Sequence, residues 1–166
     1  RIKQLTAQGR FRQLPVYSLD EIYEDKDLGT VRLSVFPNDS GEKTKYVLIL
    51  PGGGYAHCVT REEGYPIAAK FNEMGYTAFV LEYRTGFHCT PYAPMEDVSR
   101  AIKHIEEHQV EYNIDPEGYA LCGFSAGGTL AGIYASHNHG YEEYGTRRPA
   151  TIMLGYPCTN MEHWLD

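Results

Sequence analysis

The pattern Gly-x-Ser-x-Gly, formed by residues 123–127, constrains this chain more than any other feature of its sequence. An apolar run reaches Gly123, Ser125 follows, and two further glycines open a predicted helix. Such a pattern is typical of a sharp strand-to-helix turn whose central residue has a strained backbone. Glycines on both sides are needed because a Cβ would collide with the neighbouring chain. The turn would hold the Ser125 hydroxyl above the sheet edge, beside free N–H groups of the helix, so we predict that Ser125 is a nucleophile.

A second glycine cluster supports this interpretation. Gly52, Gly53 and Gly54 follow five apolar or aromatic residues at 46–50, a run typical of a central strand buried on both faces. In serine hydrolases such a loop donates N–H groups to the oxyanion, together with the residue after the nucleophile. We predict that the oxyanion hole consists of the N–H groups of Gly53, Gly54 and Ala126. A flexible turn is the alternative, whereas a phosphate loop is disfavoured because no Gly-Lys-Ser/Thr follows.

These motifs resemble the α/β-hydrolase superfamily. The chain is most similar to the branch related to acetyl-xylan and feruloyl esterases and to hormone-sensitive-lipase-like carboxylesterases. The matching segments fall in family order over roughly residues 30–157, and they are Pro51-Gly-Gly-Gly-Tyr55, Arg61-Glu62, Gly75-Tyr76, Glu82-Tyr83-Arg84, Asp97 with Ala101-Ile102, Ile114-Asp115-Pro116 and Gly123-Phe-Ser-Ala-Gly-Gly128. Many lipase-like relatives carry a histidine where this chain has Pro51, which favours the branch with proline.

The resemblance implies an α/β fold with a mostly parallel sheet, helices on both faces and an N-terminal antiparallel hairpin. Residues 1–18 would form a peripheral arm, and residues 19–166 the hydrolase core. It also implies a serine esterase that cleaves short, acetyl-type esters through an acyl-enzyme, with acylated carbohydrate as one substrate class. Tyr55, His57 and Arg61 flank the glycine loop and are candidates for the substrate pocket. The chemistry requires no metal ion and no organic cofactor.

The residues that should activate Ser125 are missing from their expected places. Acyl transfer needs a base for the hydroxyl proton and a carboxylate that orients the base, and in this superfamily both follow later strands. His137 and His139 lie in a polar loop, and only His163 follows the last predicted strand. We therefore expect the acid and the base beyond Asp166, so that the chain is the N-terminal two-thirds of a hydrolase with its C-terminal part missing. A rearranged triad in a full-length protein is the alternative.

Periodicity predicts the remaining elements. Short strands are expected at 19–23 and 31–36, a helix from about 64–66 to 74, a strand at 77–81, an amphipathic helix over 94–112 and a last strand at 150–156. Arg84 is interpreted as a buried ion partner that braces the loops, or alternatively as a ligand for a carboxylate substrate. Asp97, in the first turn of the amphipathic helix, is a bracing carboxylate or, alternatively, a catalytic acid.

Charge and cysteine content restrict the partners. The net charge of −7, without a basic cluster, argues against nucleic acid and anionic membranes. No apolar run is long enough to span a membrane. Cys58, Cys89, Cys122 and Cys158 lack the paired spacing of a zinc site, and we expect reduced thiols in a cytoplasmic protein. A small-molecule ester is the expected partner, and assembly into a homo-oligomer is left open. Because the first residue is Arg1 and not Met, we expect that the true start has been processed, trimmed or left out.

Two other functions remain open at this point. A prolyl-oligopeptidase-like peptidase shares the serine turn, but it usually carries a long upstream propeller domain that this chain lacks. A non-catalytic binding protein with a hydrolase fold would explain the missing histidine. Reactivity toward an ester, compared with a dipeptide amide, distinguishes the three.

Overall fold

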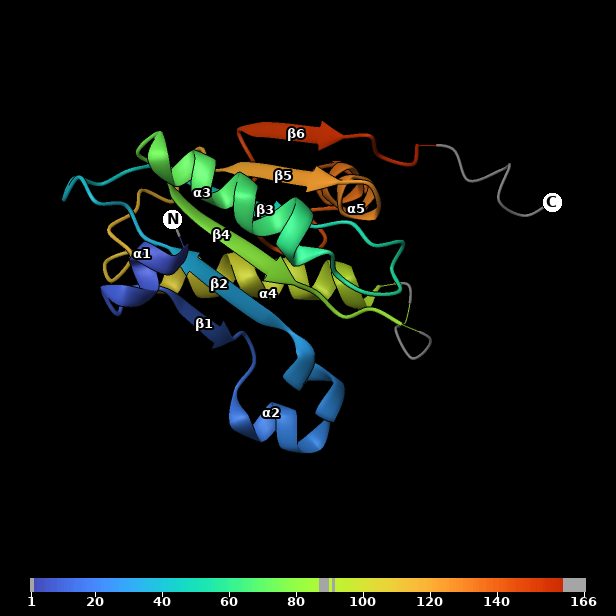
Figure 1. Cartoon of the computed structure of the whole chain (residues 1–166). Coiled ribbons are helices and arrows are strands. Elements are labelled where there is room, and N and C mark those ends of the chain that lie inside the picture. The colour runs from blue at the N-terminus through green and yellow to red at the C-terminus, as the bar shows by residue number, and fades with distance from the viewer. Residues whose placement is uncertain (1, 87–89, 91, 160–166) are drawn as a thin grey trace.

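The computed structural model describes residues 2–86, 90 and 92–159, and these residues contain a six-stranded sheet with helices on both faces (Figure 1). The strand order is β1-β2-β4-β3-β5-β6. Four strands run parallel, namely β3 (Tyr46–Leu50), β4 (Thr77–Glu82), β5 (Ala120–Phe124) and β6 (Thr151–Gly155). β2 (Arg32–Phe36) is antiparallel to both β4 and β1 (Arg12–Pro15). The predicted fold class is confirmed.

The antiparallel pair is built differently from the prediction. The expected strand at 19–23 is wrong, because Leu19–Glu24 is helix α2. Its start is fixed by a capping box, in which the Ser18 hydroxyl binds the Glu21 N–H and the Glu21 carboxylate binds the Ser18 N–H. The strand that pairs with the outer side of β2 is β1, which lies inside the segment expected to be a peripheral arm. Residues 12–15 therefore belong to the sheet, and helix α1 (Ile2–Ala7) buries Leu5 against it.

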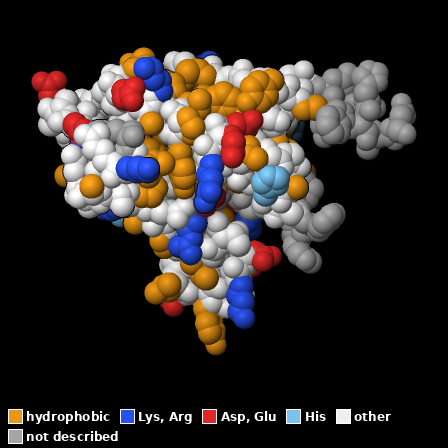
Figure 2. All heavy atoms as spheres, in the orientation of Figure 1, with side chains coloured by type: hydrophobic (Ala, Val, Ile, Leu, Met, Phe, Trp, Pro, Cys, Tyr) orange, Lys and Arg blue, Asp and Glu red, His pale blue; other side chains and the backbone are white. Residues whose placement is uncertain are grey.

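A lobe projects from the sheet beyond β2. It consists of α2 and the 3-10 helix Lys26–Thr30, and it lies at the bottom of Figure 1. Leu19 and Tyr23 are exposed on it, and hydrophobic side chains are visible on this lobe in Figure 2. The lobe precedes β2, which runs against the parallel strands, so it lies near their carboxyl ends.

The core has two layers, one on each face of the sheet. Helices α1 and α3 (Tyr65–Glu73) pack on one face, and α4 (Ala93–Glu107) and α5 (Ala126–Tyr134) pack on the other. All five residues of β3 are buried, as predicted for a central strand. Burial of each large aliphatic side chain contributes about 1.5–3 kcal/mol. α4 ends at Glu107, earlier than predicted, and turns follow it up to Tyr112, which packs on Phe79.

The parallel strands direct four turns to one edge of the sheet. The glycine loop follows β3, Tyr83 and Arg84 follow β4, Ser125 follows β5, and Tyr156 follows β6. In open α/β sheets ligands bind outside the carboxyl ends of the strands. This edge is therefore where a functional site is expected.

Two further sequence expectations concern thiols and membranes. Burial raises the pKa of the Cys122 thiol to about 11 and that of Cys58 to about 12, so both are protonated at neutral pH. Cys89 lies outside the described residues. Within the described part of the chain, every helix is too short or too polar to cross a lipid bilayer.

Candidate active site

Ser125 occupies the turn between β5 and α5. Its φ of 50° and ψ of −121° confirm the predicted strain, which costs about 1–3 kcal/mol. The Ser125 N–H donates to the Gly155 carbonyl at 2.8 Å, which ties the turn to the end of β6. The side chain is half-buried, and no residue in the described ranges hydrogen-bonds its Oγ. The hydroxyl is thus accessible and not engaged.

Glycines allow the serine turn to lie against the end of β3. A Cβ at Gly127 would lie 2.7 Å from the carbonyl carbon of Leu50 and closer still to its oxygen. A Cβ at Gly123 would collide with the backbone of Gly127 in the same way. At Gly52, a Cβ would lie 2.8 Å from the Ser125 Cβ. The glycine loop and the serine turn, expected to face one another, are in contact.

The three predicted oxyanion donors remain available. Gly53 and Gly54 have φ values of 128° and 61°, which favour glycine. In the part of the chain that the structure describes, neither their N–H groups nor that of Ala126 have a hydrogen-bond acceptor. The Gly52 N–H differs, because it donates to Glu63 Oε2 at 2.8 Å. The loop thus has one engaged amide followed by two free ones.

The turn after β4 holds both ends of the glycine loop. The Tyr83 hydroxyl donates to the Pro51 carbonyl at 2.6 Å, and this bond is buried. The Gly86 N–H donates to the Tyr55 carbonyl at 2.8 Å. Backbone hydrogen bonds of this kind restrict the loop conformations. The position of the glycine loop therefore depends on residues 83–86.

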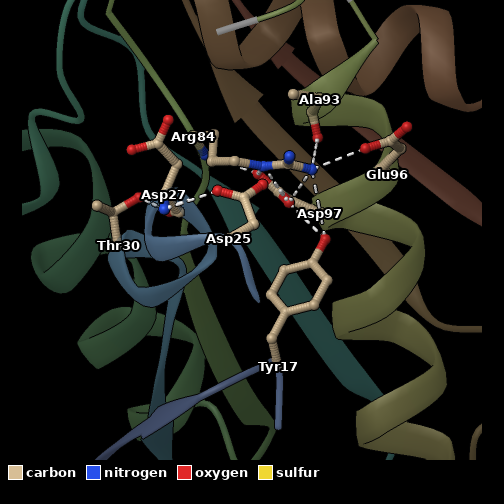
Figure 3. A network of polar contacts seen from close by, with 8 residues as sticks. All are labelled: Tyr17, Asp25, Asp27, Thr30, Arg84, Ala93, Glu96 and Asp97. Atoms are coloured by element: carbon tan, nitrogen blue, oxygen red, sulfur yellow. Dashed lines mark hydrogen bonds and ion pairs between the residues drawn. The ribbon is translucent and has the colours of Figure 1, made fainter. Parts of the chain in front are cut away.

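Arg84 anchors that turn through a buried ion pair (Figure 3). Its Nε lies 2.9 Å from Asp97 Oδ1, and its backbone N–H donates to Oδ2 at 2.7 Å. Asp97 is fully buried, and it also accepts the Tyr17 hydroxyl at 2.6 Å. The guanidinium further contacts the Ala93 carbonyl and Glu96. Burial and the bond to Asp97 raise the pKa of Tyr17, which keeps it a donor. The bracing interpretations of Arg84 and Asp97 are confirmed.

We expect Asp97→Asn to lower the free energy of unfolding of the complete gene product by about 3 kcal/mol. The Arg84 guanidinium would lose its buried charged partner and keep, among the described residues, only the exposed Glu96, and removal of one member of a buried pair is costly. Urea denaturation measures the change. Asp20→Asn, at an exposed position of α2, is the matched control and should change stability by less than about 0.5 kcal/mol. Equal effects of the two substitutions would contradict the bracing role.

A cavity of about 810 Å³ opens beside α5. Its walls are mostly apolar and include Tyr55, Met95, Leu130 and Ile133. It also contains Thr129, whose N–H and hydroxyl both donate to the Ser125 carbonyl. The cavity therefore adjoins both the glycine loop and the first turn of α5, and its volume suits a small organic ligand.

The three residues predicted to form the substrate pocket, Tyr55, His57 and Arg61, do not line one common cavity. Tyr55 has a left-handed backbone (φ 57°) and lines the cavity beside α5. His57 and Arg61 are exposed and line a separate groove of about 590 Å³, together with Gln13 and Glu82. The structure thus brings one of the three predicted residues to the cavity near Ser125, and it places the other two elsewhere.

Within the described residues, one histidine, His139, lines the cavity beside α5, together with Glu143. The exposed His137 Nδ1 lies 3.0 Å from Glu142, and the exposed His139 Nδ1 lies 3.8 Å from Glu143. His104 and His108 stack on each other along α4. His88 lies outside the described residues, and so do His163 and the rest of the C-terminal segment 160–166. No group of three potential metal ligands occurs among those that are described.

One family model and several known proteins match the chain. The family model described as BD-FAE matches residues 34–160. Among curated proteins, the chain is 32% identical over 159 residues to endo-1,4-beta-xylanase B of Butyrivibrio fibrisolvens, and 31% identical over 125 residues to an acetylxylan esterase of Xylanibacter ruminicola. These matches cover 89% and 75% of this chain, but 25% and 24% of the two relatives.

Solved structures of an acetyl ester hydrolase and of an alpha/beta hydrolase also resemble the chain. An acetyl ester-xyloside bifunctional hydrolase from Caldicellulosiruptor lactoaceticus superposes with a TM-score of 0.78 at 30% identity, over 92% of this chain and 59% of that one. MGS-M1, an alpha/beta hydrolase from a deep-sea metagenome library, gives a TM-score of 0.73 at 30% identity, over 89% and 57%. The chain thus spans about a quarter of the curated relatives and less than two thirds of the solved ones.

Proposed function

The chain belongs to the BD-FAE family of α/β-hydrolase esterases, and on this premise we propose that it carries the nucleophile and the oxyanion hole of a serine carboxylic-ester hydrolase. The contact between Gly52 and Ser125 is the observation that supports the proposal most strongly. It brings an accessible hydroxyl next to a loop with free amides. Acyl transfer by serine needs this combination.

The reaction would proceed through an acyl-enzyme. Ser125 Oγ attacks the ester carbonyl carbon and gives its proton to a base, while Gly53, Gly54 and Ala126 donate N–H groups to the oxyanion. The carbon–oxygen bond to the alcohol then breaks, and the alcohol leaves with the proton. Water attacks the acyl-enzyme, the carboxylic acid is released, and the proton returns to Ser125. One oxyanion donor contributes about 10²–10³-fold to kcat.

We propose that the base and its carboxylate lie in the part of the hydrolase that this chain does not cover. Relatives extend well beyond the matched region, since the chain spans 57–59% of the solved structures. β6 pairs with β5 alone among the described strands, and Ile152 and Leu154 are 44% and 43% exposed on it. Hydrophobic side chains gather over this part of the molecule in Figure 2. An apolar edge strand of this kind is suited to pairing with further chain.

The proposed substrates are short acyl esters, with acetylated carbohydrate as the physiological class. Two relatives are named acetylxylan esterase and acetyl ester-xyloside hydrolase, and a third is named xylanase. The cavity beside α5 also contains Tyr92 and Tyr144, and aromatic side chains of this kind suit the walls of a binding cleft. No nucleic-acid or membrane partner is proposed.

We also propose a reducing, cytoplasmic environment. Cys58 and Cys122 are free thiols, and burial raises the pKa of each. Protonated, shielded thiols are typical of proteins that do not depend on disulfides. Assembly into a homo-oligomer stays open.

Turnover of p-nitrophenyl acetate by the complete gene product, compared with turnover of a dipeptide amide, tests the proposed function. We expect hydrolysis of the ester at least ~100-fold faster than that of the amide, because an ester has the better leaving group and the family consists of esterases. Release of acetate from acetylated xylan, measured beside it, tests the carbohydrate class. Preferential cleavage of the amide would favour a prolyl-oligopeptidase-like peptidase. An absence of turnover on both would favour a binding protein.

A further inference from the structure

One carboxylate joins three turns at the edge of the sheet. Glu63 is half-buried, and its Oε2 accepts the Gly52 N–H at 2.8 Å. Its Oε1 accepts the Tyr156 hydroxyl, also at 2.8 Å. Gly52 follows β3 and Tyr156 follows β6, and β5 lies between these strands in the sheet. The carboxylate therefore links the two strands that flank the serine turn.

Gly52 is tightly enclosed by this carboxylate and by the serine turn. A Cβ at Gly52 would lie 2.5 Å from Glu63 Oε2, and 2.8 Å from both the Phe124 carbonyl oxygen and the Ser125 Cβ. Real Cβ atoms do not approach other atoms so closely. Any shift of Glu63 therefore acts on Gly52, and any shift of Gly52 acts on Ser125.

The backbone around Glu63 fixes the carboxylate in this position. Thr60–Gly64 form a π-helical turn, which the Tyr65 N–H closes by donating to the Thr60 carbonyl. Turns of this type are rare and occur frequently at functional sites. A Cβ at Gly64 would lie 2.7 Å from Val80 Cγ1, so the turn is packed directly on β4. The packing leaves the Glu63 backbone little freedom to move.

Tyr156, which donates its hydroxyl to Glu63, has a strained backbone. Tyr156 has a φ of 39°, in the left-handed region, and the residue is 66% exposed, so burial does not hold it there. The bond to Glu63 raises the pKa of the Tyr156 hydroxyl, which therefore remains a donor at neutral pH. The preceding residue, Gly155, accepts the Ser125 N–H. The conformation of Tyr156 is thus coupled to the serine turn.

We propose that Glu63 is a positioning residue for the oxyanion hole. It holds the Gly52 N–H and so fixes the first peptide of the glycine loop, which directs the free Gly53 and Gly54 amides toward the ester oxygen. Through Tyr156 it also sets the place of Ser125 relative to these amides. Glu63 acts through Gly52 and does not touch the substrate. The inference rests on the proposed esterase function, which it deepens.

Kinetics of Glu63 variants of the complete gene product test this role. For Glu63→Ala we expect kcat for p-nitrophenyl acetate to fall by ~10–100-fold, with KM changed by less than about threefold, because oxyanion donors act mainly in the transition state. Glu63→Gln should recover kcat to within about threefold of wild type. Its amide oxygen can accept the Gly52 N–H, and its NH₂ group can donate to the Tyr156 oxygen.

Two further variants separate positioning from stability. Tyr156→Phe removes only the outer bond of the link at an exposed position, and we expect a fall in kcat of about 3–10-fold with an unchanged urea midpoint. Glu62→Ala is the matched control, since this neighbouring glutamate is exposed, and kcat should stay within about twofold of wild type. The rate of labelling by a fluorophosphonate should fall in parallel with kcat.

Each outcome decides for or against the inference. A Glu63→Ala enzyme with wild-type kcat would overturn it, as would a Glu63→Gln enzyme as slow as Glu63→Ala. If Glu63→Ala does not fold, a Tyr156→Phe enzyme with normal kcat would still overturn it. A wild-type protein that neither turns over esters nor reacts with the fluorophosphonate would overturn the proposed function and this inference with it. A failure of the inference alone leaves wild-type turnover intact, so the two failures are distinguishable.

Discussion

Ser125→Ala is expected to abolish ester hydrolysis by the complete gene product without unfolding it. We expect kcat for p-nitrophenyl acetate to fall by at least roughly 10⁴-fold, because no acyl-enzyme can form without the hydroxyl. The oxyanion donors alone would leave modest residual catalysis. Alanine would adopt the same backbone conformation (φ 50°) at a similar cost, so the urea midpoint should change little.

A second serine serves as the control for this substitution. Ser136 is half-buried and lies just beyond the end of α5, outside the serine turn. Ser136→Ala should leave kcat within about twofold of wild type. If Ser125→Ala retained more than about a tenth of wild-type kcat, another group would carry the reaction, and the proposed role of Ser125 would be wrong.

Gly127→Ala is expected to prevent folding, or to lower the free energy of unfolding by at least about 4 kcal/mol. Its Cβ would overlap the carbonyl oxygens of Leu50 and Pro51, and both belong to the backbone at the end of β3. No side-chain rotation can relieve such an overlap. α5 would have to move away from β3, which would also separate Ser125 from the glycine loop.

The same helix offers a matched glycine with space around it. A Cβ at Gly132 would lie 3.6 Å from Leu154 Cδ1, an ordinary van der Waals distance. Gly132→Ala should therefore stabilise the protein by about 0.5–1 kcal/mol, through the higher helix propensity of alanine. Urea denaturation of both variants measures the contrast. Equal effects would show that α5 is not packed on β3 as closely as the structure indicates.

Elements with a strong local pattern were predictable from the sequence. The five apolar or aromatic residues of β3 predicted the central strand, and the glycine spacing around Ser125 predicted the turn between β5 and α5. The resemblance over residues 30–157 agrees with the family model, which matches 34–160. In these segments the local preference and the tertiary structure coincide.

The N-terminal segment was predicted less well, for two physical reasons. The short segment 19–23, Leu-Asp-Glu-Ile-Tyr, fits a strand as well as one turn of helix, and the capping box of Ser18 and Glu21 decides between them. β1 is a four-residue edge strand whose alternation is too short to stand out. Its pairing with β2 exists only in the tertiary structure.

The site was predictable in its motifs and not in its supporting contacts. Ser125 and the glycine loop follow from residue spacing, whereas the bonds of Glu63 join residues 11 and 93 positions apart. Those bonds depend on the order of β3, β5 and β6 and on a π-helical turn, neither of which a local pattern encodes. For a similar reason His57 and Arg61, although close to the glycine loop in sequence, line a different groove from Tyr55.

The residue that becomes covalently modified is the most direct test of the proposed mechanism. The complete gene product is incubated with a fluorophosphonate and digested, and the modified peptide is identified by mass spectrometry. We expect a single adduct, on Ser125, that is absent from the Ser125→Ala variant, because the serine turn contacts the glycine loop, whose Gly53 and Gly54 amides are free among the described residues. An adduct on a different serine, with Ser125 unmodified, would contradict the assignment of the nucleophile.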